Sequence, residues 1–308
     1  MNSKELLSGV WTALITPFDS TGAVDHSAFE KLLDQQLQAN ITGILLCGST
    51  GEALTLRVSE KLALIKRARA FMGDKAKLMV GCGGSDTHQS VELAGLCVDA
   101  GAQSLLVVTP PYNKPPLGGL IAHFRSVCQA ISQDIPVVVY HIPSRTGQSL
   151  SPAWLTELLA SHPSLKGVKE ASSNPIVFSR HLTSAQQADL DIAWLSGDDH
   201  GFLPTLSVGG AGIISVTSGV FPDAMMALWN AYQAGNITLA TQIHQTLFPF
   251  MDALFGEVNP LGVKAMLSEI DLCPPHHRLP LVPAAMSTTK VLFPLYGQVK
   301  LQLAELTS

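Results

Sequence analysis

Residues 136–140, PVVVY, form an apolar run that is too short for a helix and is rich in β-branched residues. Similar runs, rich in Val, Ile and Leu, recur along the chain, as expected of strands that are buried on both faces. They occupy residues 10–16, 41–47, 77–82, 104–109, 165–169, 192–196 and 211–216. Together with 136–140, these runs predict the strands of a parallel sheet.

Helical patterns separate the apolar runs. Asp25 is a candidate N-cap for one helix, and Ser59 and Thr87 precede two further helical patterns. Strands that alternate with helices predict the α/β class and a (β/α)8 barrel, a fold that typically takes about 250 residues. A doubly wound sheet is the alternative, but the turn after the first run lacks the Gly-x-Gly-x-x-Gly pattern of that fold.

The last part of the chain contains more helix than a barrel needs. Helical patterns cover residues 237–255, 261–269 and 284–305 and are broken by the segment CPPHHRLPLVP. We therefore expect a catalytic barrel over residues 1–235 and a C-terminal helical region over residues 236–308. His276 and His277 lie in the broken segment, which we expect to be far from the strand ends, and no third ligand is nearby in sequence. No metal site is expected there.

The composition limits the class of protein. Of the 308 residues, 46% are hydrophobic and only 14% are charged, against about 25% charged in ordinary globular proteins. This low charge fits either a membrane protein or a protein that buries its surface in subunit contacts. No run of about 18 apolar residues is present, so a membrane-spanning helix is not expected.

The charge balance and the cysteines narrow the partners and the location. Lys and Arg number 19 against 24 Asp and Glu, and no basic cluster is present, so nucleic acid is not an expected partner. The five cysteines are scattered and form no CxxC pair, which indicates neither a zinc site nor a disulfide framework. The N-terminus does not have the build of a signal peptide, so the expected location is the cytoplasm.

Lys169 ends the run LKGVK at residues 165–169. The two-residue period of a strand places Leu165, Gly167 and Lys169 on one face, and Gly167 would leave room beneath a long side chain. An ammonium that is removed from water has a lowered pKa, and the resulting amine can form a Schiff base with a ketone. The alternative is a lysine whose head pairs with Glu170 or reaches solvent.

Tyr140 ends the strand that precedes the strand of Lys169. Neighbouring strands lie about 4.8 Å apart, so the phenol can reach the amine and move the protons that Schiff-base chemistry requires. The alternative is a tyrosine of the core whose hydroxyl is hydrogen-bonded. Ser49, Thr50 and Tyr112 would supply further hydroxyls from other loops.

Two segments are candidates for binding a carboxylate. The turn GSTGE, residues 48–52, is rich in glycine and could offer backbone N–H groups. The planar guanidinium of Arg145, in PSRTG, suits a substrate carboxylate. The glycines of GGAGIIS, residues 209–215, enter the last strand rather than follow it, so we expect no phosphate site there.

Eight sequence blocks occur in a fixed order: ITPF, GSTGE, VTPPYN, YHIPSRTG, GVKEAS, LSGDD, GIISVTSG and NPLGVK. This set resembles the dihydrodipicolinate synthase/N-acetylneuraminate lyase superfamily of Schiff-base aldolases, and the resemblance covers nearly the whole chain. It implies that Lys169 forms a Schiff base with pyruvate or another 2-keto acid, without a cofactor or a metal. Tyr140 would be the acid/base group, and Ser49 would relay protons between Tyr140 and Tyr112.

The resemblance also implies binding roles and an assembly. The backbone of Ser49, Thr50 and Gly51 would hold the keto-acid carboxylate, and the main chain of Ile214 would lie against the substrate. In the family, the residue that matches Tyr112 comes from the neighbouring subunit. This implies a homodimer, and the usual assembly is a homotetramer built as a dimer of dimers.

Arg145 indicates the second substrate. It matches the arginine with which the synthases bind the carboxylate of aspartate semialdehyde. The expected reaction condenses pyruvate with L-aspartate 4-semialdehyde to 4-hydroxy-tetrahydrodipicolinate, in the diaminopimelate and lysine pathway. Ser49 is the residue usual in the lyases, so the alternative is a pyruvate-dependent aldolase or dehydratase for a sialic acid or a 2-keto-3-deoxy sugar acid. A third possibility is a keto-acid-binding protein without turnover.

Feedback inhibition by lysine is expected to be weak or absent. The enterobacterial-type synthases bind lysine with polar groups that this chain replaces. The replacing residues are Ala53, Leu54, Val58, Lys61, Gln89 and Pro111.

Overall fold

The computed structural model describes residues 2–307, and its parallel strands form a closed barrel in the order β1 to β8. The strands are β1 (Gly9–Ala13), β2 (Gly43–Leu46), β3 (Lys77–Gly81), β4 (Ser104–Val108), β5 (Val137–His141), β6 (Leu165–Glu170), β7 (Ala193–Ser196) and β8 (Gly212–Ser215). The predicted α/β barrel is confirmed. No strand extends beyond its predicted run by more than one residue.

One short helix, α1 (Ser3–Leu7), precedes the first strand. The other helices follow the strands along the chain and continue after the last strand. They are α2 (His26–Gln38), α3 (Val58–Met72), α4 (Thr87–Asp99), α5 (Leu117–Gln129), α6 (Pro143–Thr146), α7 (Pro152–Ala160), α8 (Pro175–Gln187), α9 (Phe202–Ser207), α10 (Pro222–Gln233), α11 (Ile237–Leu254), α12 (Leu261–Glu269) and α13 (Met286–Thr307). The short 3₁₀ helices η1 (Ala53–Thr55) and η2 (Thr217–Gly219) complete the set. None of the helices described here is long and apolar enough to cross a membrane.

The helix caps were predicted in part. Asp25 caps α2, because its carboxylate accepts hydrogen bonds from the first backbone N–H groups of that helix. Ser59 and Thr87, which were expected to precede their helices, instead lie inside them. In α3, the Glu60 carboxylate accepts from the backbone N–H of Arg57, and in α4 the Asp86 carboxylate caps the first turn, so both helices begin earlier than expected.

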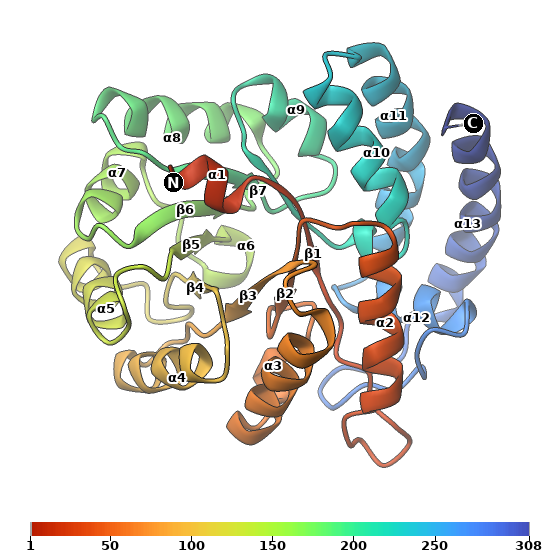
Figure 1. Cartoon of the computed structure of the whole chain (residues 1–308), viewed down its shortest axis with the longest axis horizontal. Coiled ribbons are helices and arrows are strands. Elements are labelled where there is room, and N and C mark those ends of the chain that lie inside the picture. Colours follow the sequence, from red (N-terminus) through yellow and green to blue (C-terminus); the bar gives the residue numbers. More distant parts are fainter. Residues whose placement is uncertain (1, 308) are drawn as a thin grey trace. The chain divides into compact units, whose positions relative to one another are not determined.

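The chain forms two compact units. The first unit contains the residues up to 9 together with residues 77–214, and the second contains residues 10–76 and 215–308. In the first unit, α4, α5, α7 and α8 pack against one another in chain order and lie outside the strands β4 to β6 (Figure 1). The short helix α1 also belongs to this unit and lies against β6 and β7.

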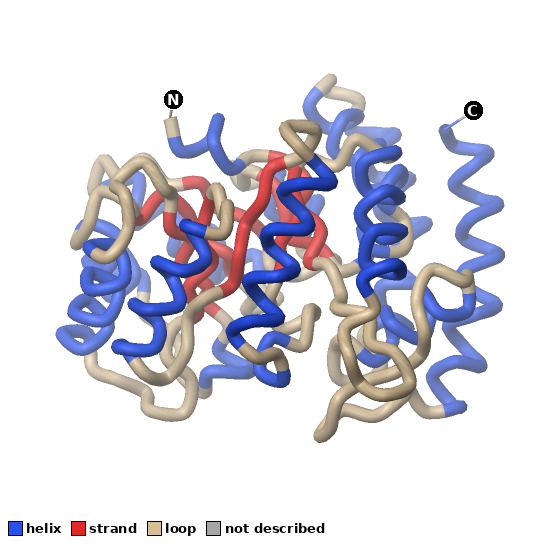
Figure 2. The backbone as a smooth tube through the Cα atoms, turned by 60° about the horizontal axis from the view of Figure 1, so that its bottom comes forward, coloured by secondary structure: helices blue, strands red, loops and turns tan. Residues whose placement is uncertain are grey.

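The second unit holds the C-terminal helices. Helix α11 packs between α10 and α13, and α12 also contacts α13. The helix that ends at the label C, α13, runs beside its neighbours in both views (Figures 1 and 2). Leu247, Phe250 and Met251 are fully buried in α11, so these helices have an apolar core of their own. The three predicted C-terminal helices are confirmed as α11, α12 and α13.

Candidate active site

Lys169 lies near the end of β6, and its side chain is only 6% exposed. The parallel register pairs it with Tyr140 on β5. As a result, the amine nitrogen Nζ lies 4.4 Å from the centre of the Tyr140 ring. The predicted proximity of these two residues is confirmed, and a lysine that reaches solvent is excluded.

The surroundings of Lys169 change its acidity. Burial lowers the pKa of Lys169 to about 7; the attraction of Asp199 opposes this shift, and the repulsion of Arg145 adds to it. Asp199 is itself buried and follows β7. Near neutral pH a large share of Lys169 is therefore a free amine, which is the nucleophilic form.

Two glycines shape the space around Lys169. A side chain at Gly197 would begin 3.1 Å from Cε of Lys169 and 2.7 Å from Cβ of Ala171, so glycine leaves room for the lysine. A side chain at Gly167 would begin 2.8 Å from Cδ1 of Leu7, a buried residue of α1. The room expected beneath Lys169 is therefore occupied, because the N-terminal helix places Leu7 there.

Glu170 does not pair with Lys169, although the sequence left that alternative open. Its carboxylate oxygen Oε2 lies 2.7 Å from Nδ1 of His141 and 2.9 Å from Nδ1 of His181. The other oxygen, Oε1, accepts from the backbone N–H of Ser172. Burial raises the pKa of Glu170, but the two histidines outweigh that effect and lower it to about 2. Glu170 is thus an ionised group of a separate cluster.

The remaining predicted residues of the first unit lie in different surroundings. Arg145 is exposed in α6, close enough to Lys169 for its charge to act there. Ile214 is buried in β8. Tyr112 is 91% exposed and has a positive φ of 70° in the loop after β4. The structure therefore brings Lys169, Tyr140 and Arg145 together and does not bury Tyr112 with them.

The predicted carboxylate-binding turn belongs to the second unit. Ser49 is half-buried, and Thr50 is buried with its hydroxyl accepting from Nδ2 of Asn259 at 2.9 Å. The carbonyl of Gly51 accepts from the Thr16 hydroxyl at 2.7 Å. A side chain at Gly51 would begin 3.1 Å from the carbonyl oxygen of Leu14. The turn is thus tightly held, and Gly51 is needed for the close approach of the backbone.

The glutamate of the same turn, Glu52, forms a buried ion pair with Lys264 of α12. Nζ of Lys264 also donates to the backbone carbonyls of Thr16 at 2.9 Å and His276 at 3.0 Å. Nδ1 of His277 lies 3.2 Å from the Glu52 carboxylate. Burial raises the pKa of Glu52, but the bonds with His277 and Lys264 bring it below its ordinary value. The expectation that His277 lies far from the strand ends is wrong, because Glu52 follows β2.

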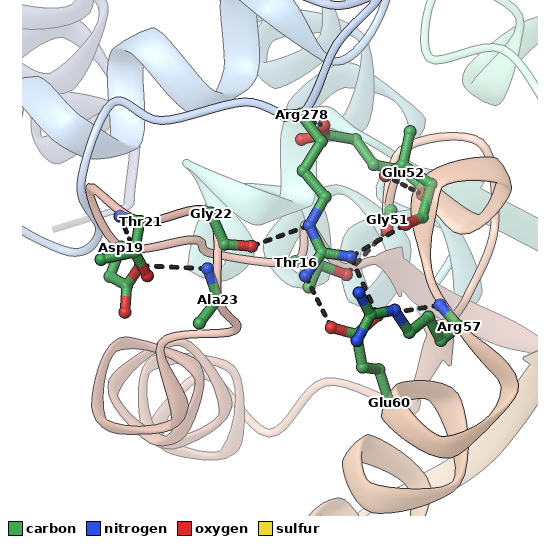
Figure 3. A network of polar contacts seen from close by, with 11 residues as sticks. Thr16, Asp19, Thr21, Gly22, Ala23, Gly51, Glu52, Arg57, Glu60 and Arg278 are labelled. Atoms are coloured by element: carbon green, nitrogen blue, oxygen red, sulfur yellow. Dashed lines mark hydrogen bonds and ion pairs between the residues drawn. The ribbon is translucent and has the colours of Figure 1, made fainter.

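Arg278 fastens the segment between α12 and α13 to the same neighbourhood. Figure 3 shows its guanidinium between the loop of Gly22 and the carboxylate of Glu60. It donates to the carbonyls of Gly22 and Thr55, each at 2.8 Å, and to both oxygens of Glu60 at 2.9 and 2.6 Å. The hydrogen bond from Arg278 lowers the pKa of Glu60 to about 2. Loop, turn and C-terminal segment are thereby joined by charged hydrogen bonds.

Sequence reasoning missed several residues of these surroundings. Asp199 was visible only as part of LSGDD, and Asn259 and Lys264 only as part of NPLGVK. Both blocks carried the family resemblance, but no role was attached to their charged groups. The sequence did contain a signal for Lys264. It lies in a largely apolar helical segment, and a lysine is costly to bury unless it has a partner of opposite charge.

Comparisons with known proteins identify the family of the chain and agree with its fold. Residues 6–293 match the model of the dihydrodipicolinate synthetase family. A 4-hydroxy-tetrahydrodipicolinate synthase of Methanococcoides burtonii is 37% identical over 287 residues, which cover 93% of this chain and 96% of the relative. Among solved structures, a monomeric dihydrodipicolinate synthase variant superposes with a TM-score of 0.93 at 34% identity, over 97% of this chain and 99% of that one. A dihydrodipicolinate synthase from Acinetobacter baumannii in complex with pyruvate has a TM-score of 0.90 at 30% identity, over 95% and 99% of the two chains.

Proposed function

The chain belongs to the dihydrodipicolinate synthetase family, and we propose that it is a 4-hydroxy-tetrahydrodipicolinate synthase, which condenses pyruvate with L-aspartate 4-semialdehyde. The observation that carries this proposal is a buried lysine, Lys169, with a pKa of about 7 beside the phenol of Tyr140. The curated relatives at similar identity have the same enzyme name. The charge of Arg145, which acts on Lys169, supports a second substrate that carries a carboxylate.

The first half of the proposed reaction forms the Schiff base. The free amine of Lys169 attacks the C2 carbonyl of pyruvate, and Tyr140 supplies a proton to the carbinolamine oxygen, which leaves as water. Ser49 would relay protons between Tyr140 and Tyr112. The backbone of the turn at Thr50 and Gly51 would hold the pyruvate carboxylate. This role is supported by the rigid hydrogen-bonding of that turn.

The second half joins the two substrates and frees the enzyme. Tyr140 would take a methyl proton from the imine, which gives an enamine. The enamine carbon attacks the aldehyde of aspartate semialdehyde and forms the new carbon–carbon bond, and the aldehyde oxygen takes up the proton as a hydroxyl. Arg145 would bind the carboxylate of this substrate, and the main chain of Ile214 would lie against the bound molecules. The substrate amine then attacks the imine carbon and displaces Lys169 as the ring closes. One water is released overall, and the protonated imine that Lys169 forms with pyruvate is the electron sink, so the proposed reaction uses no cofactor.

The assembly and the location belong to the same proposal. We propose a homodimer in which Tyr112 completes the site of the neighbouring subunit, and a homotetramer built from two such dimers. The Tyr112 ring is 91% exposed, which leaves it accessible to a neighbouring subunit and supports this role. A pathway for amino-acid synthesis from small, charged metabolites supports a location in the cytoplasm.

Two further points remain predictions. We propose that residues 1–235 form the catalytic barrel and that residues 236–308 form a separate C-terminal helical region. Leu54 and Pro111 are among the residues that stand in place of the lysine-binding polar groups, so we expect L-lysine to leave the turnover rate nearly unchanged. A micromolar inhibition curve with L-lysine would contradict this expectation.

The decisive experiment is borohydride reduction with pyruvate, followed by peptide mass spectrometry and a coupled assay. We expect an adduct on Lys169 and turnover with aspartate semialdehyde. Absence of the adduct in the wild-type protein would exclude the Schiff-base mechanism. Ser49 favours one alternative, an aldolase for a sugar acid. That alternative would replace the synthase if a sialic or 2-keto-3-deoxy sugar acid were cleaved and aspartate semialdehyde were not consumed.

A binding protein without turnover is the other alternative. Such a protein would need the carboxylate-binding turn and Arg145, but it would not need a buried amine beside a phenol. The pairing of Lys169 with Tyr140 therefore favours an enzyme. A wild-type protein that forms the adduct but turns over none of these substrates would favour the binding protein.

A further inference from the structure

His141, Glu170 and His181 form a buried cluster that the proposed reaction does not use. They come from β5, β6 and α8, respectively. His141 directly follows Tyr140, and Glu170 directly follows Lys169. Since side chains alternate along a strand, the cluster faces away from the reacting pair, toward the helices. We call these three residues the His–Glu–His cluster.

The cluster has the spacing of a metal site, but its ligand atoms are already engaged. The candidate ligand atoms of the three side chains lie within 4.8 Å of one another. However, Nε2 of His141 accepts from the backbone N–H of Leu150 at 3.0 Å, and Nε2 of His181 lies 3.0 Å from the carbonyl oxygen of Leu150. The Nδ1 atoms of both rings are bonded to Glu170. A metal ion would have to break these bonds, so the geometry points to a clamp on Leu150.

The hydrogen-bond partners also assign the protons. Nε2 of His141 accepts a hydrogen bond, so the proton of this ring is on Nδ1, which donates to Glu170. His181 faces an acceptor on each side, the carboxylate of Glu170 and the carbonyl of Leu150. Each of its two ring nitrogens is thus placed to donate a hydrogen bond, one to Glu170 and one to Leu150. A charge-assisted bond of this kind is stronger than a neutral one.

Leu150 is the end of the segment that carries Arg145. The segment runs from Ile142, after β5, through the short helix α6 to Leu150. The cluster holds both main-chain polar groups of Leu150. Within the segment, Gly147 has a positive φ of 72° and ends α6. The exposed Arg145 therefore lies in a short segment that continues from β5 at one end and is hydrogen-bonded to the His–Glu–His cluster at the other end.

We propose that His181 is a positioning residue for the second substrate: with Glu170 and His141 it fixes Leu150 and so keeps Arg145 in place to bind the substrate carboxylate. This inference rests on the proposed function, since that carboxylate belongs to aspartate semialdehyde. It predicts an effect on the second substrate that is separate from the chemistry of Lys169.

The test uses the variant His181→Phe in the full-length protein. Phenylalanine keeps a ring that can stack on Trp194, whose centre lies 6.3 Å from that of His181, but it removes both donors. We expect faster hydrogen exchange in peptides that cover residues 142–150. We also expect the KM for aspartate semialdehyde to rise about tenfold, the size of one lost charged hydrogen bond. The KM for pyruvate and the yield of the Lys169 adduct should stay within about twofold of the wild type.

A matched control separates positioning from general loosening. His123→Phe removes another buried histidine, in α5, whose Nδ1 lies 3.0 Å from the Thr87 hydroxyl. This variant should leave the exchange of residues 142–150 and the KM for aspartate semialdehyde unchanged. His181→Gln keeps one donor for the Leu150 carbonyl and should give a smaller increase in KM than His181→Phe. It also serves as the working variant if the phenylalanine variant does not fold.

A double-mutant cycle tests whether His181 acts through Arg145. In an Arg145→Ala background, His181→Phe should add no further increase to the KM for aspartate semialdehyde. Additive effects, an equal rise in the KM for pyruvate, or unchanged exchange of residues 142–150 in a folded His181 variant would each overturn the inference. The exchange measurement needs no substrate. It therefore stands even if the wild type does not use aspartate semialdehyde, a result that would overturn the proposed function alone.

Discussion

Lys169 and Lys264 are both buried lysines, and each amine lies over an aromatic ring. Nζ of Lys169 is 4.4 Å from the centre of the Tyr140 ring, and Nζ of Lys264 is 4.5 Å from the centre of the Phe18 ring. Their polar partners differ. Lys264 forms an ion pair with Glu52 and donates to two backbone carbonyls, whereas Asp199 acts on Lys169 through its charge.

Burial alone therefore does not make a lysine a nucleophile. Burial lowers the pKa of both amines, but the carboxylate and carbonyls around Lys264 all accept hydrogen bonds and favour the ammonium. The phenol beside Lys169 can donate and accept a proton. One environment fixes a cation that fastens the C-terminal region to the turn at Glu52. The other environment keeps an amine available for reaction.

The substitution Lys169→Met should have the largest effect on the difference between the two lysines. We expect the pyruvate adduct to disappear and turnover to fall by about 10⁴-fold or more. The folded pKa of about 7 lies below the ordinary value of 10.5, so the lysine destabilises the fold fully at and below pH 7, and this cost fades as the pH rises toward 10.5. Removing it should raise the free energy of unfolding by about 1–3 kcal/mol at pH 7.

Urea unfolding at pH 7 and pH 10 measures this gain, and trapping with borohydride measures the adduct. The gain in stability should be smaller at pH 10. A methionine variant that is less stable than the wild type at pH 7 would show that the amine of Lys169 is not destabilised by burial.

Lys264→Met should have the opposite effect on stability. It leaves the carboxylate of Glu52 buried without its cation, so the free energy of unfolding should fall by about 3–5 kcal/mol. The double variant Lys264→Met with Glu52→Gln removes both charges and should recover part of this loss. Urea unfolding of the two single variants and the double variant gives the coupling energy. If Lys264→Met were as stable as Lys169→Met, the contrast between the two sites would fail.

Tyr140→Phe places a phenylalanine ring beneath the amine of Lys169, as Phe18 lies beneath the amine of Lys264. The amine stays buried, but the proposed acid/base group is lost, so formation of the pyruvate adduct should slow by about 10²-fold. The change in the free energy of unfolding should be smaller than that for Lys264→Met. Rapid quenching with borohydride at successive times measures the rate. An unchanged rate would remove Tyr140 from the proton transfers.

The pH dependence of adduct formation should give the smallest effect. Because the pKa of Lys169 is about 7, the rate should rise about tenfold per pH unit below 7 and level off above it. Asp199→Asn removes an attraction that raises this pKa, so the midpoint should move to lower pH. A midpoint near 10 in the wild type would mean that Lys169 has an ordinary lysine environment.

The sequence predicted features that depend on neighbours along the chain or on adjacent strands. The period of two in LKGVK and the order of the strands were enough to place Lys169 beside Tyr140, and the register confirms it. The glycine-rich turn at residues 48–52 also follows a strand as expected. Both features arise from local patterns whose geometry the barrel fixes.

The contacts that the sequence did not predict join different elements, whether distant or adjacent in the chain. Glu52 meets Lys264, and Glu170 meets His181 of the following helix, because helices pack at angles that no local pattern encodes. The space beneath Lys169 is filled by Leu7, although the sequence predicts it to be open. The prediction misses Leu7 because this residue belongs to a helix that precedes the first strand. Such contacts depend on tertiary packing, and a single sequence gives no register for them.

The position of Leu7 has a consequence for how this protein is handled. Its side chain lies against Gly167, two residues before Lys169 on the same face of β6. Trimming the first residues, or fusing a tag that disturbs α1, would admit water below the amine and restore its hydration. The working pH range of the amine would then shift upward. Helix α1 is thus a place where an engineer can alter the pH range of the amine without changing any of the residues proposed to take part in the reaction.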